Sequence, residues 1–196
     1  SNQFYTIPQL QLAELLVENS AMDKVFFCNS GAEANEGAIK LARKHGKVNR
    51  NGAFEIVTAL NSFHGRTMMN VSATGQPHYQ EIFQPIPVGF THVPYDDFEE
   101  LKGAVTDRTT AIMLEPVQGE GGVNIPSRAY LQNVRAFCDA NGLLLIFDEV
   151  QTVKNPSSPR FTSHRNPNHT STERCEPLCT EVARAPNLSP NRSRPS

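Results

Sequence analysis

Four short segments of this 196-residue chain combine polar residues with glycines at positions where they can act on a ligand. In the first, residues 29–35, Ser30 and Glu33 have the spacing of a capping box, so a helix should begin here. Gly31 and Ala32 are small and leave the free backbone N–H groups of that helix end unobstructed. The segment predicts a phosphate-binding site at a helix N-terminus. The alternative is a well-capped helix without a ligand.

Two further segments place charged side chains in loops. In residues 61–67, Phe63 can supply a flat stacking surface and Arg66 a bidentate clamp for a carboxylate. The alternative is that the Phe63 ring packs against the core and that Arg66 is solvated. Residues 115–122 combine two carboxylates, Glu115 and Glu120, with three glycines. Such glycines indicate a backbone with positive φ or close to another group, although a tight surface loop with solvated acids would look similar.

The fourth segment, residues 148–151, follows five apolar residues. Asp148 therefore stands at the carboxyl end of a buried strand, where open α/β sheets bind ligands and where a low dielectric strengthens pairing with a cation. The Mg²⁺-holding strand of a nucleoside triphosphatase has a similar pattern, but that class needs a glycine-rich loop ending in Lys-Ser or Lys-Thr, which the sequence lacks. We predict no metal site, because the possible zinc ligands do not have zinc spacing. Those ligands are His164, His169, Cys175 and Cys179.

Hydrophobic periodicity predicts alternating strands and helices in the first 152 residues. We expect helices over 8–19, 32–45, 98–105 and 127–141, and strands over 25–28, 55–60, 90–93, 111–114 and 143–148. Gly142 lies where a glycine commonly ends a helix. This alternation predicts an α/β fold with a mainly parallel sheet.

Residues 153–196 differ in composition from the rest. They hold 7 of the 14 prolines and none of the 12 glycines, and they carry 7 basic and 3 acidic residues. We expect this tail to be disordered, because its few apolar residues have no period. A shifted reading frame or a gene-model error would also produce such a change.

The four segments together resemble the class III pyridoxal-phosphate (PLP) aminotransferases. The resemblance rests on FHGRT (63–67), EPVQGEGGV (115–123), LLLIFDEVQT (143–152) and the segment from Ser72 to Phe90, and it covers residues 1–152. It implies an incomplete large domain of the type I, aspartate-aminotransferase-like fold. The amino-acid sequence of these segments is most similar to acetylornithine aminotransferases, with ornithine and 4-aminobutyrate aminotransferases as near neighbours.

The resemblance also implies roles for single residues. The cofactor-binding residues would be those of the phosphate site (Ser30, Gly31, Ala32), the ring faces (Phe63, Val150), the ring nitrogen (Asp148), the ring hydroxyl (Gln151) and the neighbouring His64. For the substrate, the resemblance implies that Arg66 binds a carboxylate, that Glu120 is a gate residue, and that Glu115 lies in the same shell.

The family's Schiff-base lysine lies about thirty residues beyond the aspartate. Here only Lys154 follows Asp148, so we expect no catalytic lysine and no activity of this chain alone. A non-catalytic PLP-fold remnant is the alternative function. The family implies an amino acid and a 2-oxo acid as substrates and a homodimer as the assembly. A net charge of −2, the lack of a long apolar run and the pattern of four cysteines predict a cytoplasmic protein without nucleic-acid or membrane partners.

Overall fold

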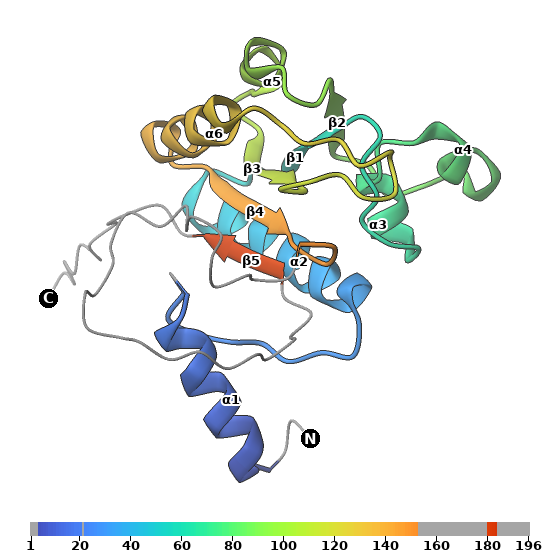
Figure 1. Ribbon diagram of the computed structural model, residues 1–196. Coiled ribbons are helices and arrows are strands. Elements are labelled where there is room, and N and C mark those ends of the chain that lie inside the picture. Colours follow the sequence, from blue (N-terminus) through green and yellow to red (C-terminus); the bar gives the residue numbers. More distant parts are fainter. Residues whose placement is uncertain (1–3, 21, 153–179, 184–196) are drawn as a thin grey trace, which may run out of the picture.

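A five-stranded sheet forms the centre of the computed structural model, which describes residues 4–20, 22–152 and 180–183. The strand order is β2-β1-β3-β4-β5 (Figure 1). Strands β1 (Glu55–Ala59), β2 (Phe90–Val93), β3 (Thr109–Leu114) and β4 (Leu144–Asp148) are parallel, and β5 (Thr180–Ala183) pairs antiparallel with β4. The mainly parallel α/β fold predicted from the sequence is confirmed.

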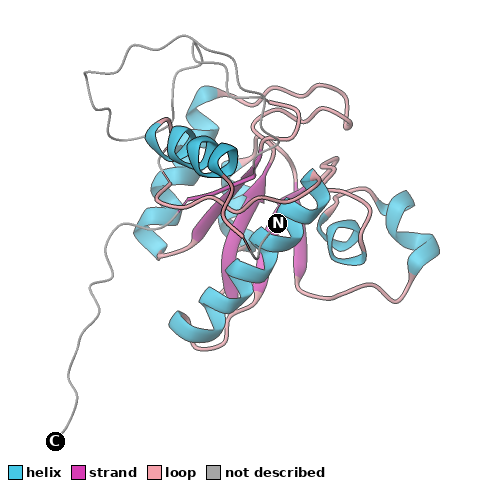
Figure 2. Ribbon diagram, turned by 90° about the horizontal axis from the view of Figure 1, so that it is seen from below, coloured by secondary structure: helices cyan, strands magenta, loops and turns pink. Residues whose placement is uncertain are grey.

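Helices cover both faces of the sheet, as an α/β fold requires. On one face, Val57, Ile112 and Leu145 pack against α5 (Phe98–Ala104) and α6 (Arg128–Asn141). On the other face, Ile56, Met113 and Ile146 pack against α2 (Gly31–Asn49) and α3 (Met68–Ala73). Figure 2 shows the strands in the middle of the molecule with helices around them. All six residues of β3 are buried, which makes it the central strand of the core.

The long helices begin within one residue of the predicted positions, whereas α2 runs four residues beyond its predicted end at residue 45. Ser30 caps α2 by accepting a hydrogen bond from the N–H of Glu33, and Ser127 caps α6 in the same way. Gly142 ends α6 with a φ of 62°, a left-handed conformation that glycine adopts without strain. The short α4 (Pro77–Gln80) and the 3-10 helix η1 (Glu81–Phe83) were not predicted.

Two sequence predictions need correction. Residues 25–28 form no strand, because a strand needs a hydrogen-bonded neighbour and this segment pairs with none of the strands in the described sheet. Phe26 is accordingly 67% exposed. Thr180–Ala183 form β5, which differs from the expectation of a tail without regular structure; the rest of that prediction concerns residues outside the described ranges.

The N-terminal helix α1 (Ile7–Glu18) contributes no buried residue to the core (Figure 1). Its Pro8 lies in the first turn, and its apolar side chains are not buried, with Leu10 half exposed. None of the helices in the described ranges is long and apolar enough to cross a membrane.

Candidate functional site

Residues from three neighbouring strands meet at the carboxyl edge of the parallel sheet. Phe63 and His64 lie in the loop after β1, Glu115 directly follows β3, and Asp148 ends β4. Because parallel strands end at the same edge, this topology gathers side chains that are far apart in the sequence. His64, Glu115 and Asp148 are all buried, with 1%, 4% and 4% of their surface exposed.

Asp148 is held by two donors that come from different elements. Its Oδ2 accepts a hydrogen bond from Nδ2 of Asn35 on α2 and one from Nδ1 of His64, each 2.8 Å long. Asn35 also donates to the backbone oxygen of His64 at 2.8 Å. The three side chains form one fixed buried unit.

The N-terminus of α2 lies beside this unit. Its first intrahelical bond runs from Ala34 N to Ser30 O (3.1 Å), which leaves the N–H groups of Gly31 and Ala32 without helical acceptors. A Cβ added to Gly31 would come within 2.4 Å of Val150 Cγ2, so this glycine and Val150 are in direct contact. The predicted phosphate site and the segment after Asp148 are therefore adjacent.

Glu115 is a second buried carboxyl group at the same edge. Its Oε2 accepts the backbone N–H of Phe63 at 3.2 Å. Burial raises the pKa of the Glu115 carboxyl to about 7, and Asp148 adds to the rise, while His64 and the Phe63 N–H counteract it. Glu115 can thus hold or release a proton near neutral pH, whereas Asp148 is surrounded by hydrogen-bond donors.

The glycine-rich loop that follows Glu115 packs tightly on its neighbours. A Cβ on Gly121 would come within 2.1 Å of Asn61 O, and a Cβ on Gly119 would come within 2.9 Å of Gln151 Cγ. This confirms the expectation that the loop passes close to other groups, and it places the exposed Gln151 against the loop.

A second group of contacts lies outside the buried unit and centres on Tyr79 of α4. The Tyr79 ring meets Phe63 edge-on (centroids 5.5 Å apart, 63° between planes), and the Arg66 guanidinium lies 5.9 Å from its centroid. The Tyr79 hydroxyl donates to Oε1 of Glu120 at 2.8 Å, and Gln76 donates to its Oε2 at 2.6 Å. These bonds lower the pKa of Glu120. We call these five residues the Tyr79 cluster.

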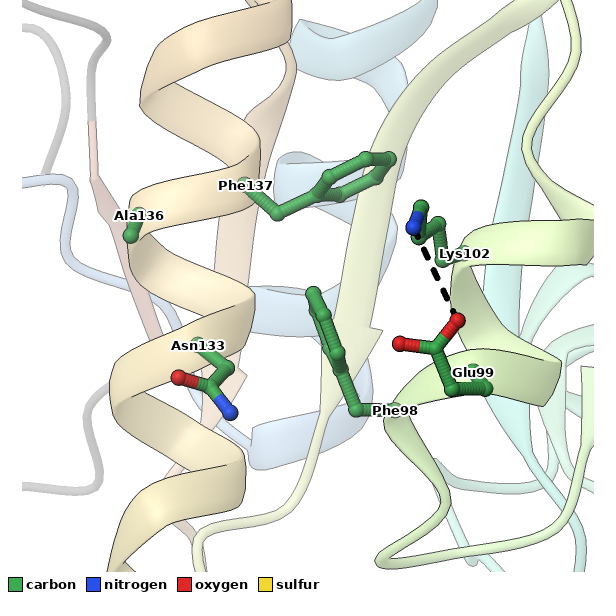
Figure 3. A pocket seen from close by; sticks show the side chains of 6 residues that line it. All are labelled: Phe98, Glu99, Lys102, Asn133, Ala136 and Phe137. Atoms are coloured by element: carbon green, nitrogen blue, oxygen red, sulfur yellow. Dashed lines mark ion pairs between the residues drawn. The ribbon is translucent and has the colours of Figure 1, made fainter.

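A shallow groove of about 420 Å³ lies between α5 and α6, on the opposite face of the sheet from α2 (Figure 3). The rings of Phe98 and Phe137 meet edge-on in it, and Glu99 pairs with Lys102 at its border. It contains none of the residues predicted to bind a ligand.

Eight of the eleven predicted site residues lie at the carboxyl edge or in the loops that leave it, and Ser30, Gly31 and Ala32 lie at the N-terminus of α2. Phe63 joins Glu115 to the Tyr79 cluster. Sequence analysis assigned no role to Asn35, Gln76 and Tyr79. Asn35 had a signal, since it is a polar residue on the helix face that also carries the buried Ala38 and Ala42. The described residues contain no group of three metal-ligating side chains, and the four zinc candidates of the tail lie outside the described ranges.

This α/β fold with a buried aspartate and a free helix N-terminus at one edge has known relatives. The family described as aminotransferase class-III matches residues 1–154. The chain belongs to this class III aminotransferase family.

Individual relatives agree with this assignment. The chain is 57% identical to the acetylornithine aminotransferase of Methanocaldococcus jannaschii over 152 residues, which are 77% of this chain and 38% of that protein. The acetylornithine aminotransferase of Gloeobacter violaceus is 57% identical over 153 residues, covering 78% of this chain and 38% of the relative. The chain thus spans little more than a third of the length of these curated relatives.

Solved structures give the same result for the fold. The ornithine aminotransferase from Toxoplasma gondii superposes with a TM-score of 0.73 at 33% identity and covers 77% of this chain and 37% of that one. The N-acetylornithine aminotransferase from Stenotrophomonas maltophilia has a TM-score of 0.60 at 38% identity, over 76% and 36% of the two chains. The fold is therefore part of an aminotransferase fold.

Proposed function

We propose that this chain carries the cofactor site of a PLP-dependent aminotransferase that moves an amino group from an acetylornithine-like ω-amine donor to 2-oxoglutarate, in arginine metabolism. The observation that carries the proposal is the buried Asp148 unit beside the free N-terminus of α2. The 57% identity to two proteins named acetylornithine aminotransferase supports the acetylated donor, as does the identity among solved structures of 38% to an N-acetylornithine aminotransferase against 33% to an ornithine aminotransferase.

The groups present fit PLP chemically. Two free N–H groups at a positive helix end suit its phosphate, and Asp148 Oδ1 accepts only a long bond (3.3 Å) from Val150 N among its described contacts, so it can accept from a ring nitrogen. Asn35 touches Asp148 one turn beyond Gly31, about 6 Å along the helix axis, a separation on the scale of this cofactor. When bound, PLP supplies an electron sink for the charge left on the substrate Cα.

The residues of the chain then have distinct tasks. Asp148, oriented by Asn35 and His64, would keep a proton on the ring nitrogen, and Phe63 and Val150 would hold the two faces of the ring. Arg66 would bind a substrate carboxylate, Gln151 would lie near the ring hydroxyl, and Glu120 would act at the entrance. We also propose the homodimer of the family and a cytoplasmic setting for the whole protein.

Equilibrium titration of the purified chain with PLP, followed by absorbance, tests the cofactor site. We expect binding that Asp148→Ala and the isosteric Asp148→Asn weaken at least about tenfold, since a charged hydrogen bond contributes about 1.5–3 kcal/mol. Asp107→Ala, at an exposed position in the turn before β3, is the matched control and should bind normally. Unchanged binding by both Asp148 variants, with circular dichroism showing normal folding, would refute the site.

We further propose that this chain alone completes no catalytic cycle, because Lys154 is the only lysine after Asp148. Incubation with PLP, acetylornithine and 2-oxoglutarate should give no repeated formation of glutamate. Multiple turnovers would mean that a lysine elsewhere in the chain performs the proton transfer, and this part of the proposal would be wrong.

A further inference from the structure

Glu120 and Arg66 have opposite charges and belong to the same cluster, yet they do not pair. Among the described residues, no carboxylate lies within ion-pair distance of Arg66. Both oxygens of Glu120 are engaged by neutral donors, Oε1 by the Tyr79 hydroxyl and Oε2 by Gln76. Arg66 instead lies over the ring of Tyr79.

Tyr79 contacts these partners with both its ring and its hydroxyl. The ring contacts Phe63 and Arg66, and the hydroxyl donates to Glu120 and is also a hydrogen-bond partner of the Arg66 side chain. The hydrogen bond to Glu120 is the main reason that the pKa of the Tyr79 hydroxyl is raised, so the hydroxyl keeps its proton and continues to donate. The Tyr79 hydroxyl thus lies between the Glu120 carboxylate and the Arg66 guanidinium, and the guanidinium also contacts the ring.

We propose that Tyr79 is a positioning residue that keeps Glu120 from pairing with Arg66 and so leaves the Arg66 guanidinium open to a carboxylate of the substrate. The inference rests on the proposed function, in which Arg66 binds such a carboxylate. Without the hydroxyl, Oε1 of Glu120 loses its donor, and Arg66 is a nearby cation that can replace it. Glu120 would then compete with the substrate carboxylate.

The ligand side can be tested without PLP. The probe is glutarate, a dicarboxylate without amino or oxo groups, titrated into the apo chain while the Arg66 Nε–Hε resonance is followed by NMR. Tyr79→Phe keeps the ring and its contacts and removes only the hydroxyl. Tyr5→Phe, at a tyrosine that is 90% exposed, is the matched control.

We expect Tyr79→Phe to raise the Kd for glutarate about threefold, the strength of an exposed ion pair, and to shift the Arg66 resonance before any ligand is added. The double variant Tyr79→Phe/Glu120→Gln should restore both readouts to within about twofold of the original chain. Raised salt should shrink the effect of Tyr79→Phe, because it screens an exposed pair. Tyr5→Phe should change neither readout.

Three results would overturn the inference: wild-type affinity in Tyr79→Phe, failure of Glu120→Gln to restore it, or no glutarate binding by any variant. The last would mean that Arg66 is not open to a carboxylate. The PLP titration is separate, so loss of PLP binding with the expected glutarate pattern would refute the cofactor site and leave the role of Tyr79 intact.

Discussion

Replacing Glu115 by glutamine should make the protein more stable at alkaline pH, although the change removes a group from the candidate site. Glu115 is 4% exposed, and burial raises its pKa from 4.5 to about 7. Glutamine has nearly the same shape, and its amide oxygen can still accept the Phe63 N–H. The substitution therefore removes the ionisation and keeps the packing.

The direction of the pH effect follows from proton linkage. Between pH 4.5 and 7 the folded protein holds this proton more tightly than the unfolded chain, so the stability that the neutral carboxyl contributes is complete below pH 4.5 and is lost as the pH rises through 7. The pKa difference corresponds to about 3 kcal/mol. Glu115→Gln should escape this loss.

Urea unfolding measured from pH 4.5 to pH 8 checks this expectation. The free energy of unfolding of Glu115→Gln minus that of the original chain should grow by about 3 kcal/mol across the range. Glu81→Gln, at an exposed position of η1, should show a constant difference near zero. A constant difference for Glu115→Gln as well would show that Glu115 ionises normally, and the argument from burial would be wrong.

Two further substitutions test local features of the site. Ser30→Ala and Ser127→Ala each remove a helix N-cap and should each lower the free energy of unfolding by about 1 kcal/mol. Only Ser30→Ala should also weaken PLP binding. Equal PLP affinity in both variants would contradict a phosphate site at α2. Gly121→Ala should destabilise the protein by about 1–3 kcal/mol, because its Cβ would lie 2.1 Å from Asn61 O. Gly103→Ala in α5, where a Cβ would have nothing within 4 Å, should be neutral or stabilising. Similar unfolding midpoints for the two variants would contradict the tight packing of the loop.

The elements of the sheet were largely predictable because they depend on local patterns. The apolar runs of β3 and β4, the cap Ser30 and the terminal Gly142 predicted their elements within a few residues. Residues 25–28, which were wrongly predicted to form a strand, have the same kind of apolar run. A strand also needs a hydrogen-bonded neighbour, and no local pattern tells whether one is available.

Side-chain partners were harder to predict than elements. On α2 the apolar Leu41 is 56% exposed, whereas the polar Asn35 is 1% exposed and reaches Asp148. Asn35 is buried because a carboxylate 113 residues away accepts its hydrogen. Tyr79 had no signal at all, since its role depends on how a short helix packs on the loop after β1.

The position of Asn35 explains why separate motifs form one site. The backbone N–H groups at the start of α2 and the Asn35 amide belong to the same helix, so regular helix geometry fixes the distance between them. The amide in turn fixes Asp148, and Val150 packs against Gly31 two residues later. The spacing between the proposed phosphate site and the buried carboxylate is thus set by one turn of a rigid helix and not by loops. Such a frame suits a ligand of constant length with a phosphate at one end and a basic nitrogen at the other.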